Sequence, residues 1–267
     1  MFKLCSSQQY ISGEMLLLVV NAIYMKAWED GRIKSKGFLI AVGINEEGNR
    51  EILGFTVADG ESEEAWSDFF SSLKARGLRN VDLLITSDNH GGLKKAIQKQ
   101  FHGTSWQRCQ THFSKNLLDK TPPKIKAEVK DSLTDLYNAP SIKDAQDRKE
   151  QMLDSYREQA PKAMTLLDES LNEVTAVFSL PAAYRKRLRT SNGIERLNEE
   201  LRRRERVIWI FSNETSMIRL MGAVLMEHHE KWSSVKKYFT MDCYFAEQEE
   251  ARKTAQVERS KRVHTVY

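Results

Sequence analysis

Glycine and proline are segregated along this 267-residue chain, and their positions limit the folds that it can adopt. Eleven of the 13 glycines lie between residues 13 and 103, none lies between residues 104 and 192, and all five prolines lie between residues 122 and 181. Glycine permits tight turns and proline interrupts helices. The first region is therefore predicted to contain strands joined by turns, and the middle region to contain helices separated by prolines.

The pattern of apolar residues predicts three antiparallel strands followed by a buried parallel strand. The first three strands are expected at residues 16–25, 37–44 and 51–57, joined by turns at residues 29–32 and 45–49. The nearly continuous apolar run at residues 81–86 is typical of a strand covered on both faces. Helices are expected at residues 62–74, 93–100, 216–228 and 247–261, and several more between residues 124 and 178. A meander continued by crossover strands is the order of the ribonuclease H-like fold, so we predict an α/β mixed sheet interrupted by an all-helical insertion.

Composition indicates a cytoplasmic protein that does not interact with membranes. No run approaches the roughly 18 consecutive apolar residues of a membrane span, and the first residues do not have the apolar segment of a secretion signal. Three scattered cysteines, Cys5, Cys109 and Cys243, do not suit a disulfide framework.

Positive charge is concentrated in one segment. The net charge is +4, yet residues 181–206 contain nine basic and four acidic residues, so the rest of the chain sums to −1. A localised basic patch is the pattern expected for nucleic-acid binding, although a solvated helix face is the simpler explanation. The predicted DNA-binding residues are Arg185, Lys186, Arg187, Arg189, Arg196, Arg202, Arg203, Arg204 and Arg206.

Three polar positions are candidates for a catalytic site. Glu195 lies at the start of a basic amphipathic helix, where it can hold a metal ion or complete a capping box with Asn192. Asp88 follows the buried strand at the edge where open sheets bind ligands, or it caps the next helix together with Asn89. Asn21 lies within an apolar strand, where an unpaired amide would cost about 1–3 kcal/mol.

Six blocks in this order resemble the mutator-type family of bacterial insertion-sequence transposases. They cover residues 21–26, 53–55, 87–94, 106–113, 190–198 and 230–232. The resemblance implies a ribonuclease H-like core at residues 10–118 and 182–245, a helical insertion at residues 119–181 and a charged tail at residues 246–267. It also implies an Asp-Asp-Glu enzyme that uses Mg²⁺ or Mn²⁺ and acts on transposon ends and target DNA as a homodimer or higher oligomer.

By the same resemblance, Asp88 and Glu195 correspond to the second and third acids and would bind the metal, whereas Asn21 stands where the family has its first aspartate. A neutral amide cannot bridge two cations well, so strand cleavage is expected to be impaired. Two alternatives remain open. One is an inactive DNA-binding or oligomerisation module derived from a transposase, and the other is a different ribonuclease H-like nuclease such as a resolvase.

Two further expectations follow from the resemblance. Family members carry an N-terminal region that recognises the element ends, and the chain begins just before the first catalytic strand, so sequence-specific recognition is expected to be missing. Cys109 and His112 resemble the family's Cys-x-x-His signature, for which we favour a hydrogen-bonding or packing role over zinc binding. From the residues alone, Trp106, Trp209 and Trp232 are expected to pack in the core, and base stacking is the alternative role for any of them.

Overall fold

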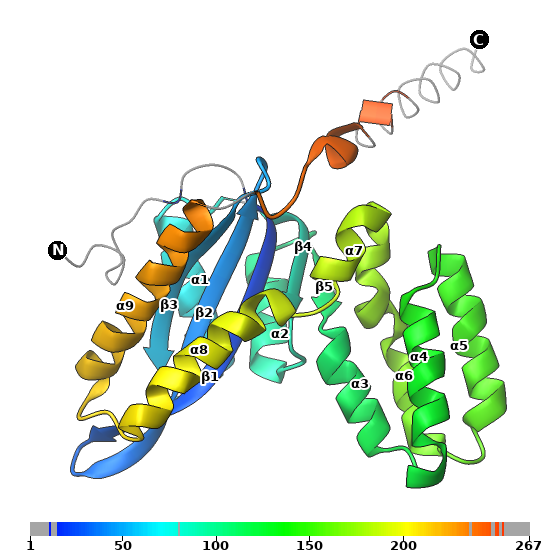
Figure 1. Ribbon diagram of the computed structural model, residues 1–267, viewed down its shortest axis with the longest axis horizontal. Coiled ribbons are helices and arrows are strands. Elements are labelled where there is room, and N and C mark those ends of the chain that lie inside the picture. The colour runs from blue at the N-terminus through cyan, green and yellow to red at the C-terminus, as the bar shows by residue number, and fades with distance from the viewer. Residues whose placement is uncertain are drawn as a thin grey trace.

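A five-stranded mixed sheet forms the centre of the protein (Figure 1). The computed structural model describes residues 11, 15–79, 81–234, 237–246, 249, 250 and 253, apart from the side chains of residues 82, 83, 192 and 193. The strands are β1 (Met15–Glu29), β2 (Arg32–Asn45), β3 (Arg50–Ala58), β4 (Val81–Ser87) and β5 (Ser105–Arg108).

The sheet has the strand order β3-β2-β1-β4-β5. β2 pairs antiparallel with both β1 and β3, whereas β4 pairs parallel with β1 and with β5. This order confirms the predicted meander and its continuation by a crossover strand. β5 was not predicted, because a four-residue strand of mainly polar residues gives no periodic signal.

The β1–β2 hairpin extends farther than its apolar residues indicate. Glu29 pairs with Arg32, so the loop has two residues, Asp30 and Gly31, with φ values of 51° and 72°. An Asp-Gly pair with positive φ at both positions is the preferred two-residue hairpin loop, because its twist matches that of the strands. Hydrogen bonding to β2 therefore carries β1 past Met25, where the predicted strand ended.

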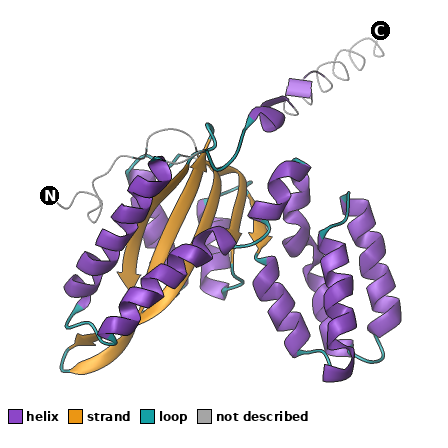
Figure 2. Cartoon of the chain, viewed as in Figure 1, coloured by secondary structure: helices purple, strands orange, loops and turns teal. Residues whose placement is uncertain are grey.

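Helices cover both faces of the sheet (Figure 2). α1 (Glu63–Ala75) and α2 (Gly91–Gln100) pack on one face, around Trp66 and Phe70. The Ser62 hydroxyl accepts a hydrogen bond from the Ala65 amide at 3.1 Å, which confirms the predicted cap of α1. α8 (Asn192–Ile208) and α9 (Glu214–Ser233) lie across the other face.

A separate helical body lies beside the β5 edge of the sheet (Figure 2). Its elements are α3 (Gln110–Asp119), η1 (Pro123–Ile125), α4 (Lys126–Tyr137), α5 (Ile142–Tyr156), α6 (Pro161–Thr175) and η2 (Ala176–Ser179). The next helix, α7 (Ala182–Leu188), packs in another core together with residues of β1, β2 and β4. Residues 124–178 are all described and contain helices but no strand, as predicted. Phe113 and Leu117 of α3 share the core of α4 to α6, so this body begins before residue 119.

Phe239, Met241 and Tyr244, near the C-terminal end of the described residues, pack in a core with residues of β1, β2 and α7. The helix predicted at residues 247–261 lies almost entirely outside the described residues. Within the described part of the chain, no helix is both long and apolar enough to cross a membrane.

Candidate active site

Asn21 and Asp88 occupy equivalent positions on two neighbouring parallel strands. The pairing of β1 with β4 runs from Leu17 opposite Leu84 to Val19 opposite Thr86. Asn21 lies two residues beyond Val19, and Asp88 lies two residues beyond Thr86. Since neighbouring strands are about 4.8 Å apart, the register brings residues 67 positions apart in sequence to the same edge of the sheet.

The face of β1 that carries Asn21 is the one covered by α8. Val19 and Ile23, two residues before and after Asn21, belong to the core shared with α8 and α9. Side chains alternate along a strand, so Asn21 is directed toward the same side. It is half-buried, and its Oδ1 accepts a hydrogen bond from the Ala22 amide at 2.9 Å. This contact gives the amide oxygen a partner within the strand.

The buried stripe of α8 sets the position of Glu195. Ile194, Leu197 and Leu201 are at most 1% exposed and pack on the β1 face, as their i, i+3 and i+7 spacing predicts. Glu195 follows the first of them and is half-buried. The helix therefore holds its first turn against the strand that carries Asn21.

The capping alternative for Glu195 does not hold. α8 begins at Asn192, and the N-cap position belongs to Ser191, whose side chain accepts no capping hydrogen bond from a main-chain amide of the first turn. Ser191 has φ −77° and ψ 7° rather than the extended geometry of an N-cap that bonds through its side chain. Its hydroxyl lies 3.3 Å from Glu195 Oε1 instead. The capping alternative for Asp88 also fails, because the N-cap of α2 is His90.

Three hydrogen bonds fix the chain before α8 to the ends of β4 and β5. The Thr86 hydroxyl donates to the carbonyl of Leu188 at 2.8 Å, and the Gln110 amide donates to the carbonyl of Arg189 at 2.9 Å. The Ser191 amide donates to Cys109 Sγ at 3.4 Å. These contacts join segments about 80 to 100 positions apart in sequence and start α8 at the edge that carries Asp88.

A continuous chain of polar contacts connects Asp88 with Glu195. His112 Nδ1 forms an ion pair with Asp88 Oδ1, and the same imidazole lies beside the Cys109 sulfur. The Ser191 hydroxyl lies 3.3 Å from both Cys109 Sγ and Glu195 Oε1, and its single proton can be donated to one of them at a time. The two acids thus belong to one network.

This network changes the proton affinity of its middle members. The hydrogen bond to Asp88, followed by that to Cys109, raises the pKa of His112 from 6.5 to about 10. Burial acts to raise the pKa of Cys109, but hydrogen bonds from His112 and Ser191 outweigh it and lower that pKa. His112 is therefore an imidazolium at neutral pH and compensates the charge of Asp88.

Three potential ligand atoms of different chemical type lie close together at this edge. Asp88, Cys109 and His112 bring their ligand atoms within 4.8 Å of one another. Mg²⁺ prefers oxygen donors, whereas sulfur and imidazole favour softer metals such as zinc. Cys109 and His112 are already engaged in hydrogen bonds, which accords with the expected hydrogen-bonding role. Of the three predicted catalytic positions, Asp88 and Glu195 have charged oxygen atoms and Asn21 has a neutral one.

Glu61, whose charge interacts with that of Asp88, was not among the predicted site residues. Burial, chiefly, raises the pKa of Glu61; His90 opposes the rise and Asp88 adds to it. Gly92 permits this approach, because a Cβ at that position would come 2.4 Å from the Glu61 carbonyl oxygen. Glu61 comes close to Asp88 because the start of α1 contacts the start of α2. The spacing of residues in the sequence does not predict this contact.

The nine predicted DNA-binding residues fall into structurally different groups. Arg185, Arg187 and Arg189 donate to main-chain carbonyls, including those of Leu180, Tyr238 and Tyr137 respectively. Two more belong to an acid-base cluster, in which Glu200 accepts from Arg203 and Arg204. The remaining four side chains are exposed and form no ion pair with any described residue: Lys186, Arg196, Arg202 and Arg206.

One of the three tryptophan predictions is wrong. Trp106 is half-buried and donates to the Ser87 hydroxyl at 2.8 Å, and Trp232 packs below the Arg50 guanidinium at 3.6 Å. Trp209, by contrast, is 74% exposed. It follows the last turn of α8, where the chain turns away from the sheet before Phe211 becomes buried.

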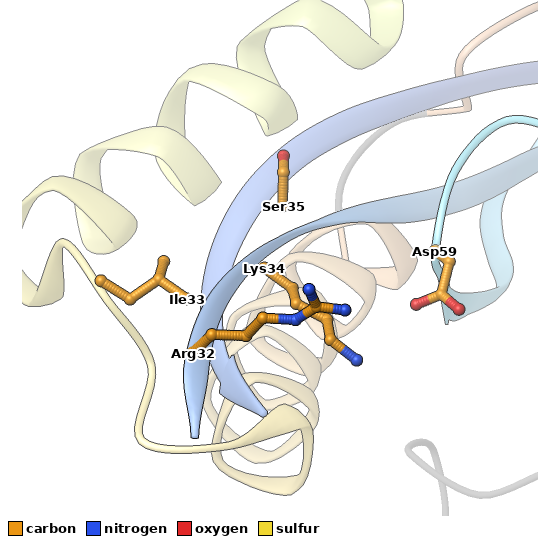
Figure 3. A pocket seen from close by; sticks show the side chains of 5 residues that line it. All are labelled: Arg32, Ile33, Lys34, Ser35 and Asp59. Carbon is orange, nitrogen blue, oxygen red and sulfur yellow. The ribbon is translucent and has the colours of Figure 1, made fainter. Parts of the chain in front are cut away.

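A second polar region lies toward the tip of the β1–β2 hairpin. A surface hollow of about 440 Å³ is lined by Arg32, Ile33, Lys34, Ser35 and Asp59 (Figure 3). Beside it, the buried Lys36 ammonium lies 2.8 Å from Glu29 and 2.5 Å from Asp59. The acidic and basic side chains around this hollow compensate one another. The residues of the network from Asp88 to Glu195 do not line it.

The protein has a mixed α/β sheet with Asp88 directly after a central parallel strand and an arginine-rich helix packed on one face. Sequence comparison identifies the family to which this architecture belongs. The profile of the Mutator family of transposases matches residues 10–235. The chain belongs to this family.

Its curated relatives are transposases of bacterial insertion sequences. It is 41% identical over 228 residues to the transposase of IS256 in transposon Tn4001 from Staphylococcus aureus, covering 84% of this chain and 58% of the relative. It is 38% identical to the ISRM5 transposase of Rhizobium meliloti (84% and 56% covered) and 36% identical to the IS1081 transposase of Mycobacterium tuberculosis (86% and 55% covered). The chain thus spans just over half the length of these relatives.

Proposed function

We propose that this chain is the catalytic region of an insertion-sequence transposase that cleaves and joins DNA strands at an Asp-Asp-Glu type site, weakened by Asn21. In this proposal residues 10–118 and 182–245 form the catalytic core, residues 119–181 form the insertion, and the protein acts on DNA as a dimer or higher oligomer. Family membership supports the activity, and the network from Asp88 to Glu195 supports its location.

One observation carries the assignment of the site. The parallel register of β1 and β4 places position 21 level with Asp88, and the apolar stripe of α8 packs on the same face of β1. The three positions are 67 and 107 residues apart in sequence, and this topology supports their assignment to one edge of the sheet. The strand order, with β2 opposed to its neighbours, further supports a ribonuclease H-like core.

Asp88 and Glu195 would hold the divalent ion, which when bound activates the attacking oxygen and stabilises charge on the leaving oxygen. The protein's own residues prepare this site. In this proposal His112 contacts one oxygen of Asp88, Ser191 contacts one oxygen of Glu195, and Asn21 offers a neutral oxygen on the β1 face covered by α8. Two carboxylates are too few to hold a pair of divalent ions at about 3.5–4 Å.

The exposed arginines of α8 would bind the DNA backbone. Arg196, Arg202 and Arg206 are exposed on α8, which begins at the edge of the sheet that carries Asp88 (the acidic edge). Phosphate contacts of this kind are independent of sequence and fix the position of the duplex.

A non-catalytic DNA-binding or oligomerisation module is the second candidate. The observation that favours it is the pairing of His112 with Asp88, which compensates one of the two remaining negative charges. Such a module would keep the cationic face of α8 but would bind divalent ions weakly.

The deciding experiment restores the carboxylate with Asn21→Asp. Binding of Mn²⁺ is followed by electron paramagnetic resonance, and nicking of supercoiled plasmid is followed with Mg²⁺ or Mn²⁺. We expect weak binding and slow or no nicking by the unchanged protein, and tighter binding with metal-dependent nicking by Asn21→Asp. The double variant Asn21→Asp, Asp88→Asn should lose both gains. Full cleavage by the unchanged protein, with no effect of Asn21→Asp, would show that the site is misplaced.

A further inference from the structure

The C-terminal end of α8 carries an unusual exposed apolar segment. Val207, Ile208, Trp209 and Ile210 are 82%, 40%, 74% and 39% exposed, whereas the next residue, Phe211, is 2% exposed. Single exposed apolar residues are common on soluble proteins, but contiguous exposed groups mark interaction sites. The exposed segment therefore requires a partner.

The backbone holds Trp209 outward in a strained conformation. Its φ is 62° and its ψ is −50°, and the Ile210 amide donates to the Ile208 carbonyl at 2.7 Å. These values describe a γ-turn with positive φ, a rare and strained turn for a bulky residue. Strain of this kind persists only where the surrounding structure enforces it, and it concentrates at functional sites.

Contacts on both sides of the turn enforce this conformation. The Trp209 amide donates to the carbonyl of Glu205 at 2.8 Å, which ends the helix. Two residues later, the Phe211 amide donates to the carbonyl of Lys26, and the Trp28 amide donates to the carbonyl of Phe211, both at 2.8 Å. Trp209 is thus presented to solvent by a turn anchored to α8 and to β1.

Two arginines that precede Trp209 on α8 indicate the chemistry of the partner. Arg202 and Arg206 precede Trp209 by seven and three residues, so they lie along one stripe of the helix. Both are exposed, and neither forms an ion pair with a described residue. A partner that covers this stripe must offer anions together with a flat apolar surface. Nucleic acid offers both, as phosphates and as the face of an unstacked base.

We propose that Trp209 stacks on an unpaired base of DNA held along α8 by Arg202 and Arg206. The inference rests on the proposed function and adds a contact to it. Glu195 and Trp209 are 14 residues apart, which corresponds to about 21 Å of helix. That length matches about six nucleotides of a B-form strand at roughly 3.4 Å each. The proposed stacking therefore occurs at a fixed distance from the acidic edge.

The test compares two duplexes that differ in one unpaired nucleotide. Affinities are measured by fluorescence anisotropy for a fully paired duplex and for the same duplex with a single-base bulge. We expect the unchanged protein to prefer the bulged duplex by roughly tenfold, the order that base–aromatic stacking supplies. Trp209→Ala should abolish this preference while keeping the affinity for the paired duplex and its salt dependence.

Two variants and one direct probe make the result specific. Trp209→Phe keeps an aromatic ring and should retain most of the preference, and Val207→Ala removes exposed apolar surface without removing a ring and should change nothing. With 5-iodouracil as the bulged base, ultraviolet light should crosslink the unchanged protein to the DNA, and Trp209→Ala should lose that crosslink.

The outcomes that overturn the inference differ from those that overturn the proposed function. Salt-dependent binding of the paired duplex with no preference for the bulge, or a preference that survives Trp209→Ala, refutes the stacking alone. Sedimentation that shows a dimer dissociated by Trp209→Ala, with DNA binding unchanged, would assign the surface to a second copy of the chain. No binding to either duplex would refute DNA binding, and the stacking with it.

Discussion

Replacing Asn21 by aspartate should make the stability of the protein depend on divalent ions. The variant should be less stable than the unchanged protein without them and at least as stable with them. The change keeps the shape of the side chain and adds one negative charge at the position level with Asp88 on the neighbouring strand. Without a cation the two carboxylates repel each other across the strand spacing. With a cation both of them become ligands.

The structure sets the size of this effect. Two unit charges about 5 Å apart repel by about 1 kcal/mol at the dielectric constant of water and about 3 kcal/mol at the value typical near a protein surface. The imidazolium of His112, paired with Asp88, offsets part of this repulsion. We therefore expect a loss of about 1 kcal/mol, or roughly 2–4 °C in Tm for a chain of this size.

Added cation should more than restore that loss. If the restored site binds Mg²⁺ with a Kd of about 1 mM, about 10 mM Mg²⁺ stabilises the folded state by roughly 1.4 kcal/mol. The assay is thermal unfolding followed by circular dichroism, in EDTA and then in Mg²⁺. The control is Gln151→Glu, which adds the same charge on an exposed position of α5.

Asn21→Asp should unfold below the unchanged protein in EDTA and at or above it in Mg²⁺, while Gln151→Glu should not respond to Mg²⁺ beyond the response of the unchanged protein. If Asn21→Asp leaves Tm unchanged in EDTA and Mg²⁺ has no effect on it, positions 21 and 88 do not share a cation site, and the register argument fails.

Four further predictions test other parts of the molecule. The double variant Arg202→Ala, Arg206→Ala should flatten the slope of log K against log salt for duplex DNA by up to about 1.8. Arg203→Ala removes a side chain already paired with Glu200 and should change this slope less. Equal slopes for the double variant and Arg203→Ala would assign the α8 arginines to a solvated face. Leu201→Ala, at a site with 0% exposure, should lower the free energy of unfolding by about 2–5 kcal/mol in urea titrations, and a loss near zero would mean that α8 does not pack on β1. In metal-free NMR titrations, His112 should keep its proton to about pH 10. Its contribution to stability is therefore present below pH 6.5 and is lost as the pH rises through 10. Asp88→Asn should lower the pKa of His112, and a pKa near 6.5 in the unchanged protein would contradict the ion pair with Asp88. Trp209→Gly should be more stable than Trp209→Ala by about 1 kcal/mol, because glycine adopts positive φ without strain; thermal unfolding that ranks the two variants in the opposite order would contradict the strained turn.

Local patterns were sufficient for much of the fold. Alternating and continuous apolar runs located β1 to β4, Ser62 located the start of α1, and the prolines separated the helices of the middle region. The i, i+3, i+7 spacing of Ile194, Leu197 and Leu201 correctly identified the buried stripe of α8. These features depend on residues close together in sequence, so they are visible without the structure.

Other features depend on which distant segments meet. The network through His112, Cys109 and Ser191 exists because the chain before α8 is hydrogen-bonded to the ends of β4 and β5, and no spacing within the sequence encodes those contacts. Glu61 enters the surroundings of Asp88 for the same reason.

The exposure of Trp209 also depends on contacts that the sequence pattern does not reveal. An apolar run of five residues predicted burial, but the strained turn after α8 buries Phe211 and leaves Trp209 exposed. Composition and periodicity determined which elements form and which of their faces are apolar. Tertiary hydrogen bonds and strand register decided which polar groups meet and which apolar group remains in solvent, because those interactions act between segments that are distant along the chain.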